Sequence, residues 1–312
     1  MVFPFDALFF SPMNFRRLGF ITLIFVYLLV LAGGIVRSTG SGMGCPDWPT
    51  CFGRIVPPTH ESQLPFNYQE IYKEKLHGEV AFNATKTWIE YLNRLLGAVT
   101  GLVILVTTIA AFKHTRKTFW YTFLAFVFVM ANAALGKKVV DSFLLPGVVT
   151  AHMALTIAVI FFLLLALYHN SEKQTVGAFG RNLILLNLVL IGVQILLGTQ
   201  VREEMDVVIK ELGEQAKEQW IDHLGIKYII HRSFTWLIIL TNGYLYFKLE
   251  AKQAFIRNYL VNIFVLLGIS VGSGILMAYF ALPFGSQPIH LTLSLLTLGL
   301  HIRMWILTKA ND

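Results

Sequence analysis

Charged residues are scarce in this sequence. Lys, Arg, Asp and Glu make up only 14% of its 312 residues, whereas soluble globular domains carry about 25%. Disordered, collagen-like and coiled-coil chains all need a different composition, and a soluble enzyme with so few charges would have too little hydrated surface. The composition therefore excludes these classes and indicates a protein of the lipid bilayer.

The apolar residues, 55% of the chain, gather into eight long runs. Each run is long enough to cross a hydrocarbon core as a helix, and none shows the alternating pattern of a barrel strand. We therefore predict an all-α membrane protein with eight transmembrane helices. The predicted spans are 18–37, 88–112, 119–135, 148–168, 183–202, 227–247, 260–282 and 289–307.

The loops between these spans predict the orientation of the chain. With the N-terminus inside, Lys and Arg outnumber Asp and Glu in the inner segments but not in the outer ones. Both termini are therefore expected to be cytoplasmic, and the two long loops, 38–87 and 203–226, are expected outside. The first seventeen residues show no cleavage signal, so we expect the first run to remain as a span. No basic patch interleaved with aromatic residues indicates nucleic-acid binding.

The sequence contains only two cysteines, Cys45 and Cys51, and both fall in the first outer loop. An even pair outside the cytoplasm indicates a disulfide or a redox-active dithiol. Zinc binding is disfavoured because the two thiols lack spaced partner ligands. Two unpaired surface thiols are the remaining alternative.

The chain also repeats itself. His152 and His290 each follow a proline-containing turn in the fourth span of their half, and they lie 138 residues apart. We therefore predict two tandem four-helix-bundle repeats of the same orientation, residues 1–170 and 171–312. The other matching segments are 92–94 with 230–232, 135–136 with 273–274, and Gly33-x-x-Val36-Arg37 with Gly198-x-x-Val201-Arg202.

Three histidines lie about one turn inside the outer ends of predicted spans: His152, His231 and His290. A polar side chain at this depth is costly unless it faces the bundle and finds a partner. His231 and His290 come from the second and fourth spans of one repeat, which is the usual arrangement of bis-histidine haem ligands in a helix bundle. Interhelical hydrogen bonds are the alternative role.

Other ionisable residues lie at the same outer level. Glu90 is three residues before Asn93 on one helix face, where a partly buried carboxyl could transfer protons or complement the helix dipole. Arginine forks at this level could hold haem propionates or anchor the helices at the membrane interface. These arginines are Arg37, Arg94, Arg202 and Arg232.

Two stretches resemble a known family. Residues 33–42, Gly-Gly-Ile-Val-Arg-Ser-Thr-Gly-Ser-Gly, followed by residues 45–51, Cys-Pro-Asp-Trp-Pro-Thr-Cys, resemble the start of haem A synthases. Residues 90–97, Glu-Tyr-Leu-Asn-Arg-Leu-Leu-Gly, resemble the second-span motif of that family. His152, His231 and His290 fall where its other haem histidines lie, so the resemblance covers all eight spans.

The resemblance implies an oxidoreductase of cytochrome oxidase biogenesis, which oxidises a methyl group of haem O to a formyl group by successive hydroxylations and so produces haem A. It implies a haem b held by His231 and His290 in the C-terminal half and a substrate haem at His152 in the N-terminal half. Glu90 would be catalytic, and the cysteine pair would be a redox feature of the outer face.

The same resemblance implies a cellular setting. The protein would lie in a bacterial cell (inner) membrane with its haem sites towards the outer face. Haem O synthase would act upstream, an unidentified donor would supply electrons, and homo-oligomerisation is left open.

The sequence departs from the family pattern at two places. Asn93 stands where the family usually has a histidine, and a second cysteine pair is absent. Asn is a poor iron ligand, so Asn93 would line the substrate pocket and His152 alone would bind the substrate iron. The free axial position suits oxygen chemistry, whereas a bis-histidine haem suits electron transfer.

Two other functions compete with this interpretation. A cytochrome b-type electron-transfer protein would explain His231 and His290 but neither the cysteine pair nor Glu90. A transporter would place charged groups near the middle of the membrane, whereas here they lie at the outer level.

Overall fold

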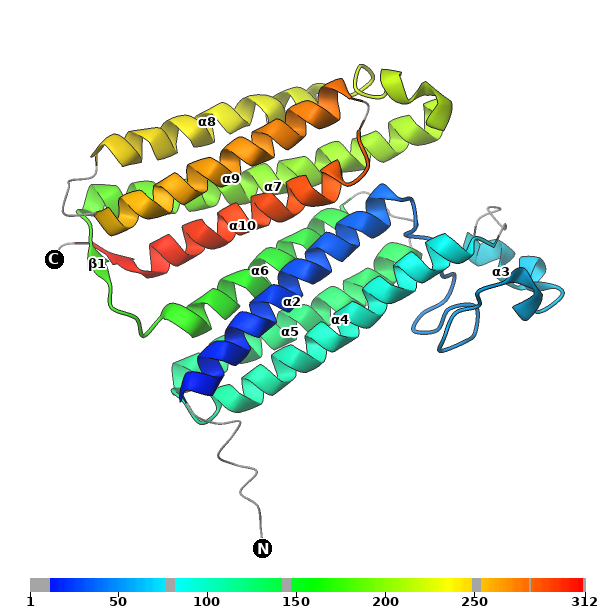
Figure 1. The fold of residues 1–312 in the computed structure, drawn as a ribbon, viewed down its shortest axis with the longest axis horizontal. Coiled ribbons are helices and arrows are strands. Elements are labelled where there is room, and N and C mark those ends of the chain that lie inside the picture. Colours follow the sequence, from blue (N-terminus) through cyan, green and yellow to red (C-terminus); the bar gives the residue numbers. More distant parts are fainter. Residues whose placement is uncertain (1–11, 77–81, 142–146, 249–253, 281, 311–312) are drawn as a thin grey trace, which may run out of the picture.

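The computed structural model describes residues 12–76, 82–141, 147–248, 254–280 and 282–310, and the structural statements below concern these residues. Eight long helices in this part run side by side along one direction (Figure 1). They are α2 (Pro12–Ser38), α4 (Ala84–Ala111), α5 (Arg116–Asp141), α6 (Val148–Tyr168), α7 (Ala178–Leu212), α8 (Ile226–Lys248), α9 (Ala254–Tyr279) and α10 (Ser286–Ile306).

Short elements join the long helices at the two ends of the bundle. The segment between α2 and α4 contains η1 (Glu61–Gln63) and α3 (Tyr68–Leu76), and η2 (Glu214–Gln219) lies between α7 and α8. At the opposite end, β1 (Gln174–Thr175) pairs in parallel with β2 (Thr308–Lys309). The link between α6 and α7 is thereby tied to the chain that follows α10.

The fold is an all-α, multi-pass membrane protein, as predicted. Within the described ranges, seven of the eight long helices are long and apolar enough to cross a membrane, and α8 is the exception. The first turns of α8 contain Lys227, His231 and Arg232, which lower its hydropathy. The eighth span, and with it the orientation of the chain, stays a prediction.

One predicted boundary is wrong. The fifth span was expected to end at residue 202 and to give way to an outer loop, but α7 continues to Leu212. The added residues include Glu, Met and Lys, which favour helix, and the first glycine after them is Gly213. Gly213 adopts φ +76°, a conformation that ends the helix. The charges beyond Arg202 therefore do not mark the end of the helix.

The helices form two groups, α2 with α4–α6 and α7 with α8–α10, and these groups meet through α2 against α10, α6 against α7 and α6 against α10 (Figure 1). In the first contact Gly34 packs directly on Pro288. In the second, the hydroxyls of Thr150 and Thr199 are 2.8 Å apart. Residues 34 and 199 occupy the same place in the predicted repeat, as do 288 and 150. The division into residues 1–170 and 171–312 stays a prediction that these paired contacts support.

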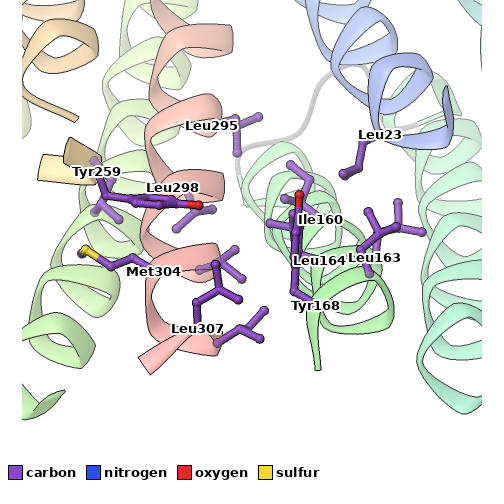
Figure 2. Close-up of a cluster of buried hydrophobic side chains, with 14 of the residues drawn as sticks. Leu23, Ile160, Leu163, Leu164, Tyr168, Tyr259, Leu295, Leu298, Met304 and Leu307 are labelled. Carbon is purple, nitrogen blue, oxygen red and sulfur yellow. The ribbon is translucent and has the colours of Figure 1, made fainter. Parts of the chain in front are cut away.

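The core between the groups is apolar, with one cation at its edge. Figure 2 shows buried leucines of α10, among them Leu295 and Leu298, facing side chains of α6. Nearby, the guanidinium of Arg303 lies 4.4 Å from the ring centre of Tyr168 and 5.4 Å from that of Tyr259. Because lipid is as apolar as leucine, close packing and such polar contacts hold membrane helices together.

We predict that Gly34→Ala destabilises the contact between the two groups. A methyl group on Gly34 would lie 2.8 Å from Cβ and 2.9 Å from Cα of Pro288, which cannot rotate away. Overpacking of this kind costs about 1–3 kcal/mol. The control is Gly101→Ala on α4, where no atom lies within 4 Å of the added methyl group. Thermal unfolding in detergent should show a lower Tm for Gly34→Ala only; an unchanged Tm would contradict the packing account.

Candidate functional site

We call the residues predicted to lie at the level of a haem iron the iron-level positions, and they are Asn93, His152, His231 and His290. Each lies against a glycine of the neighbouring helix. A methyl group on the glycine would come within 4 Å of the side chain at that position, and only at Gly198 would the contact be tighter than an ordinary van der Waals contact. The four pairs are Gly33 with Asn93 (3.9 Å), Gly136 with His152 (3.6 Å), Gly198 with His231 (3.1 Å) and Gly274 with His290 (3.6 Å). Each glycine therefore lies where its helix approaches the helix that carries the iron-level side chain.

The structure brings His231 of α8 and His290 of α10 together. Their ring centres are 6.3 Å apart and their planes are inclined by 67°. Two imidazoles that bind one metal ion from opposite sides, each through a bond of roughly 2 Å, have ring centres about 6 Å apart. The spacing of the two rings therefore suits one iron between them.

Hydrogen bonds on α9 fix the orientation of His290. Its Nδ1 lies 2.9 Å from the carbonyl oxygen of Ser270 and 2.9 Å from Oγ of Ser273, which itself donates to that carbonyl. Nδ1 therefore carries the proton and donates to Ser270, which leaves the lone pair on Nε2. A second hydrogen bond of this kind is what orients metal-binding histidines.

His231 is held through its backbone. Nε2 of Gln194, on α7, donates to the carbonyl oxygen of His231 and to Oγ1 of Thr235, both over 2.9 Å. Gln194 therefore holds the turn of α8 that contains His231 against α7.

In the N-terminal half, Asn93 and His152 occupy the equivalent positions on α4 and α6. Oδ1 of Asn93 is buried and accepts no hydrogen bond from the residues that the structure describes. Thr156 links its own helix to α5, because its hydroxyl donates to the carbonyl of His152 (3.1 Å) and accepts from Asn132 (2.9 Å). The turn that carries His152 is thus tied to the neighbouring helix.

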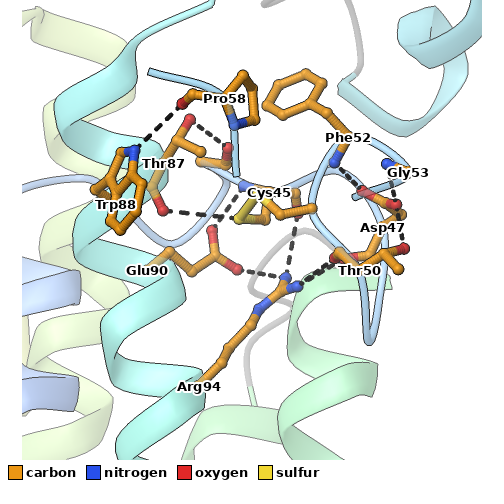
Figure 3. The surroundings of a disulfide bond; sticks show 12 residues. Cys45, Asp47, Thr50, Phe52, Gly53, Pro58, Thr87, Trp88, Glu90 and Arg94 are labelled. Carbon is orange, nitrogen blue, oxygen red and sulfur yellow. Dashed lines mark hydrogen bonds and ion pairs between the residues drawn. A yellow bond between two sulfur atoms is a disulfide. The ribbon is translucent and has the colours of Figure 1, made fainter. Parts of the chain in front are cut away.

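The predicted disulfide is confirmed. Cys45 and Cys51 are bonded, with Cα atoms 4.8 Å apart, and both side chains are fully buried (Figure 3). The loop that they close sits on the start of α4, where the hydroxyl of Thr87 donates to the carbonyl of Gly44 over 2.8 Å. The disulfide is therefore enclosed by protein.

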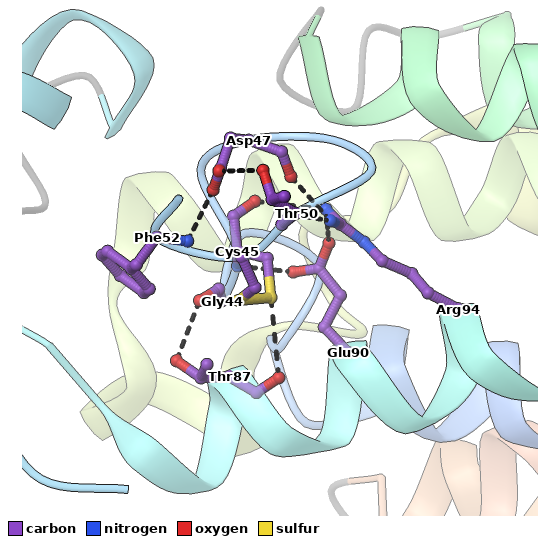
Figure 4. Close-up of polar contacts among 9 residues, drawn as sticks. Gly44, Cys45, Asp47, Thr50, Phe52, Thr87, Glu90 and Arg94 are labelled. Atoms are coloured by element: carbon purple, nitrogen blue, oxygen red, sulfur yellow. Dashed lines mark hydrogen bonds and ion pairs between the residues drawn. A yellow bond between two sulfur atoms is a disulfide. The ribbon is translucent and has the colours of Figure 1, made fainter. Parts of the chain in front are cut away.

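Glu90 lies beneath this loop and is 3% exposed. Its Oε2 accepts the backbone N–H of Cys45 at 2.9 Å, and its Oε1 accepts Nη2 of Arg94 at 2.6 Å (Figure 4). A carboxylate on the second span is thus joined directly to the disulfide loop.

Arg94 serves the loop as well. Nη1 donates to the carbonyls of Asp47 (2.6 Å) and Thr50 (3.0 Å), and Nη2 donates to that of Cys45 (3.2 Å). Sequence reasoning treated Arg94 as a propionate candidate and missed this role. The four-residue spacing between Glu90 and Arg94 was an available signal for their ion pair, because such pairs face each other on a helix, but not for the loop contacts.

Asp47, which sequence reasoning missed, organises the rest of the loop. Its carboxylate accepts the backbone N–H groups of Phe52 (2.6 Å) and Gly53 (2.7 Å). These bonds hold Phe52 at φ +54°, and its ring packs edge-on against Tyr68 and Tyr72. Burial and the negative charge of Asp47 raise the pKa of Tyr72. No sequence pattern singled out this carboxylate.

Two of the predicted arginines share one carboxylate. Arg37 of α2 and Arg202 of α7 both form ion pairs with Asp206, the second at 2.9 Å. Nε of both arginines and Nη1 of Arg202 are buried without a hydrogen-bond partner in the described part of the chain. Arg232 is exposed, with its guanidinium 5.6 Å from the ring centre of Tyr228. Arg37 and Arg202 therefore keep donors free for a second anionic group.

Comparison with known proteins adds a family. The family described as cytochrome oxidase assembly protein matches residues 16–302. The heme A synthase of Shewanella oneidensis is 28% identical over 212 residues, which are 66% of this chain and 62% of that protein. The heme A synthase of Exiguobacterium sp. is 32% identical over 126 residues, 39% and 34% of the two chains. That of Bacillus cereus is 29% identical over 146 residues, 46% and 40%. The matched regions thus span less than two thirds of these relatives.

We predict that Arg94→Lys opens the disulfide loop. A lysine ammonium cannot reproduce the planar fork that joins three carbonyls and Glu90, and each lost hydrogen bond to a charged group contributes about 1.5–3 kcal/mol. A water-soluble reductant followed by thiol labelling should therefore modify Cys45 and Cys51 at least tenfold faster than in the unchanged protein. The control is Arg54→Lys, because Arg54 donates to Gln63 at an exposed position. Equal labelling rates in both variants would refute the role of Arg94.

Proposed function

Because the chain belongs to the cytochrome oxidase assembly protein family, we propose that it is a haem A synthase, an oxidoreductase of haem biosynthesis. It oxidises a methyl group of haem O to a formyl group by successive hydroxylations. The observation that carries this proposal is the buried contact between Glu90 and the Cys45–Cys51 loop, together with the facing imidazoles of His231 and His290.

The residues of the C-terminal half fit a haem b. The porphyrin leaves two axial positions on the iron, so two histidines suffice. His231 and His290 have the required spacing, and the bond from His290 to Ser270 directs the free lone pair of the imidazole away from α9. When bound, haem b supplies one-electron transfer at this site.

The residues of the N-terminal half fit the substrate. His152 has room beside Gly136 and would bind the iron of haem O. Asn93 occupies the position that His231 has in the other predicted repeat, but it offers only an amide oxygen. One axial position of the substrate iron would therefore stay open. This asymmetry assigns electron transfer to the C-terminal half and the oxidation to the N-terminal half.

Arg37 and Arg202 are the residues that we propose for the porphyrin propionates. Their three unpartnered donors suit a carboxylate, and the guanidinium fork binds carboxylates in two-point contacts. Arg232 lies at the same outer level and stays a further candidate. Arg94 is committed to the disulfide loop, so we do not assign it to a propionate.

Glu90 is the residue that we propose for proton transfer. It is buried, and the charge of Arg94 and the N–H of Cys45 hold its two oxygens in fixed directions. A positioned acid or base contributes about 10²–10⁴-fold to a rate. Its contact with the loop brings the disulfide close to the proposed chemistry. We propose that this end of the bundle faces the outer side of a bacterial membrane, and that the protein acts after a haem O synthase and receives electrons from a separate donor.

The alternative is a cytochrome b-type protein that only transfers electrons. The pair His231 and His290 favours it equally. It gives no role to the buried contact between Glu90 and the disulfide loop, which the haem A synthase proposal uses.

We predict that His231→Ala and His290→Ala each abolish the low-spin haem signal of the purified protein, because either change removes an axial ligand. The control is His60→Ala, since His60 is exposed in the outer loop. Electron paramagnetic resonance and absorbance spectra report the spin state, and membrane extraction reports insertion. A normal bis-histidine spectrum in either variant would refute the assignment.

A further inference from the structure

The outer end of α7 carries two adjacent carboxylates that the proposed chemistry does not use, Glu203 and Glu204. They lie in the stretch that the sequence predicted to be loop, and their side chains contact different helices. We propose that they are positioning residues. Glu203 fixes the position of the start of α6, which carries His152, and Glu204 fixes the position of the start of α8, which carries His231. This inference rests on the proposed function in taking these two histidines as iron ligands.

Glu203 caps α6 from outside. It is 8% exposed, and its Oε1 accepts the backbone N–H of Gly147 at 3.1 Å and the hydroxyl of Thr150 at 3.0 Å. Gly147 stands at the N-cap with φ +88° and has no side chain to cap the helix itself. The carboxylate of α7 therefore supplies both the acceptor and the negative charge that a helix N-terminus favours. His152 follows five residues later.

Glu204 does the same for α8. Its Oε1 accepts the backbone N–H of Gly225 at 2.9 Å, and α8 begins at the next residue. A methyl group on Gly225 would lie 2.8 Å from that oxygen, so the contact requires glycine there. The first turn of α8 has no acidic residue of its own. Glu204 thus provides the complementary charge, and His231 follows six residues after Gly225.

The same helix also contacts both ligand turns directly. Gly198 lies against the ring of His231, and the hydroxyl of Thr199 is 2.8 Å from that of Thr150, two residues before His152. Within two turns, α7 therefore touches each ligand helix at two points. As a continuous helix that contacts both ligand helices, α7 therefore helps to set the position of each histidine relative to the other.

The test uses four variants of the full-length protein: Glu203→Ala, Glu203→Gln, Glu204→Ala and Glu204→Gln. Amide hydrogen exchange is read at the first turns of α6 and α8, and the low-spin signal is read by electron paramagnetic resonance. Glu204→Ala should speed exchange at the start of α8 about tenfold, the size expected for a lost cap, and should shift the low-spin signal. Glu203→Ala should speed exchange at the start of α6 to a similar degree and leave the low-spin signal unchanged.

Each alanine variant is the matched control for the other. The glutamine variants keep the accepting oxygen, so exchange in them should stay near that of the unchanged protein. Changes at both helices in each alanine variant, or at neither, would overturn the inference. If His231→Ala leaves the haem signal intact, the proposed function fails, while the exchange pattern still decides the positioning roles.

Discussion

A polar side chain that is to bind a metal inside a bilayer must be enclosed by protein, because lipid offers it no hydrogen bond. In this chain each of the four iron-level side chains lies against a glycine of the adjacent helix. The contact is tightest at Gly198, where a methyl group would lie 3.1 Å from the ring of His231, so this glycine leaves room for the imidazole. His231 and His290 face each other inside the bundle.

The same constraint governs the carboxylates at the end of the bundle that carries the disulfide. Glu90 is paired with Arg94 and an N–H of the disulfide loop, Asp206 joins two arginines, and Glu203 and Glu204 accept N–H groups at the starts of two helices. Each carboxylate therefore fixes one loop or helix end against another. This end of the bundle is held by these charge-assisted contacts, while the rest combines apolar packing with buried hydrogen bonds between helices.

The sequence was sufficient to predict a structural feature where one physical signal determines that feature. Hydropathy located the long helices. The positions of His231 and His290 in the second and fourth spans of one repeat predicted that they meet, and two cysteines in one loop predicted their bond. It failed at the end of α7, because charges after Arg202 resemble a loop although a helix can continue into water. It also missed the acceptors of Arg94, since they are backbone carbonyls of a folded loop, which no residue pattern reveals.

The central claim is that the N-terminal half oxidises haem O while the C-terminal half holds haem b. The most direct measurement is mass identification of the porphyrins extracted from the purified protein after supply of haem O. The account predicts haem b together with haem A or its hydroxylated precursor, and haem b with unconverted haem O for Glu90→Gln, while the exposed control Glu70→Gln behaves as the unchanged protein. Haem b alone, with no oxidised product from the unchanged protein, would contradict it.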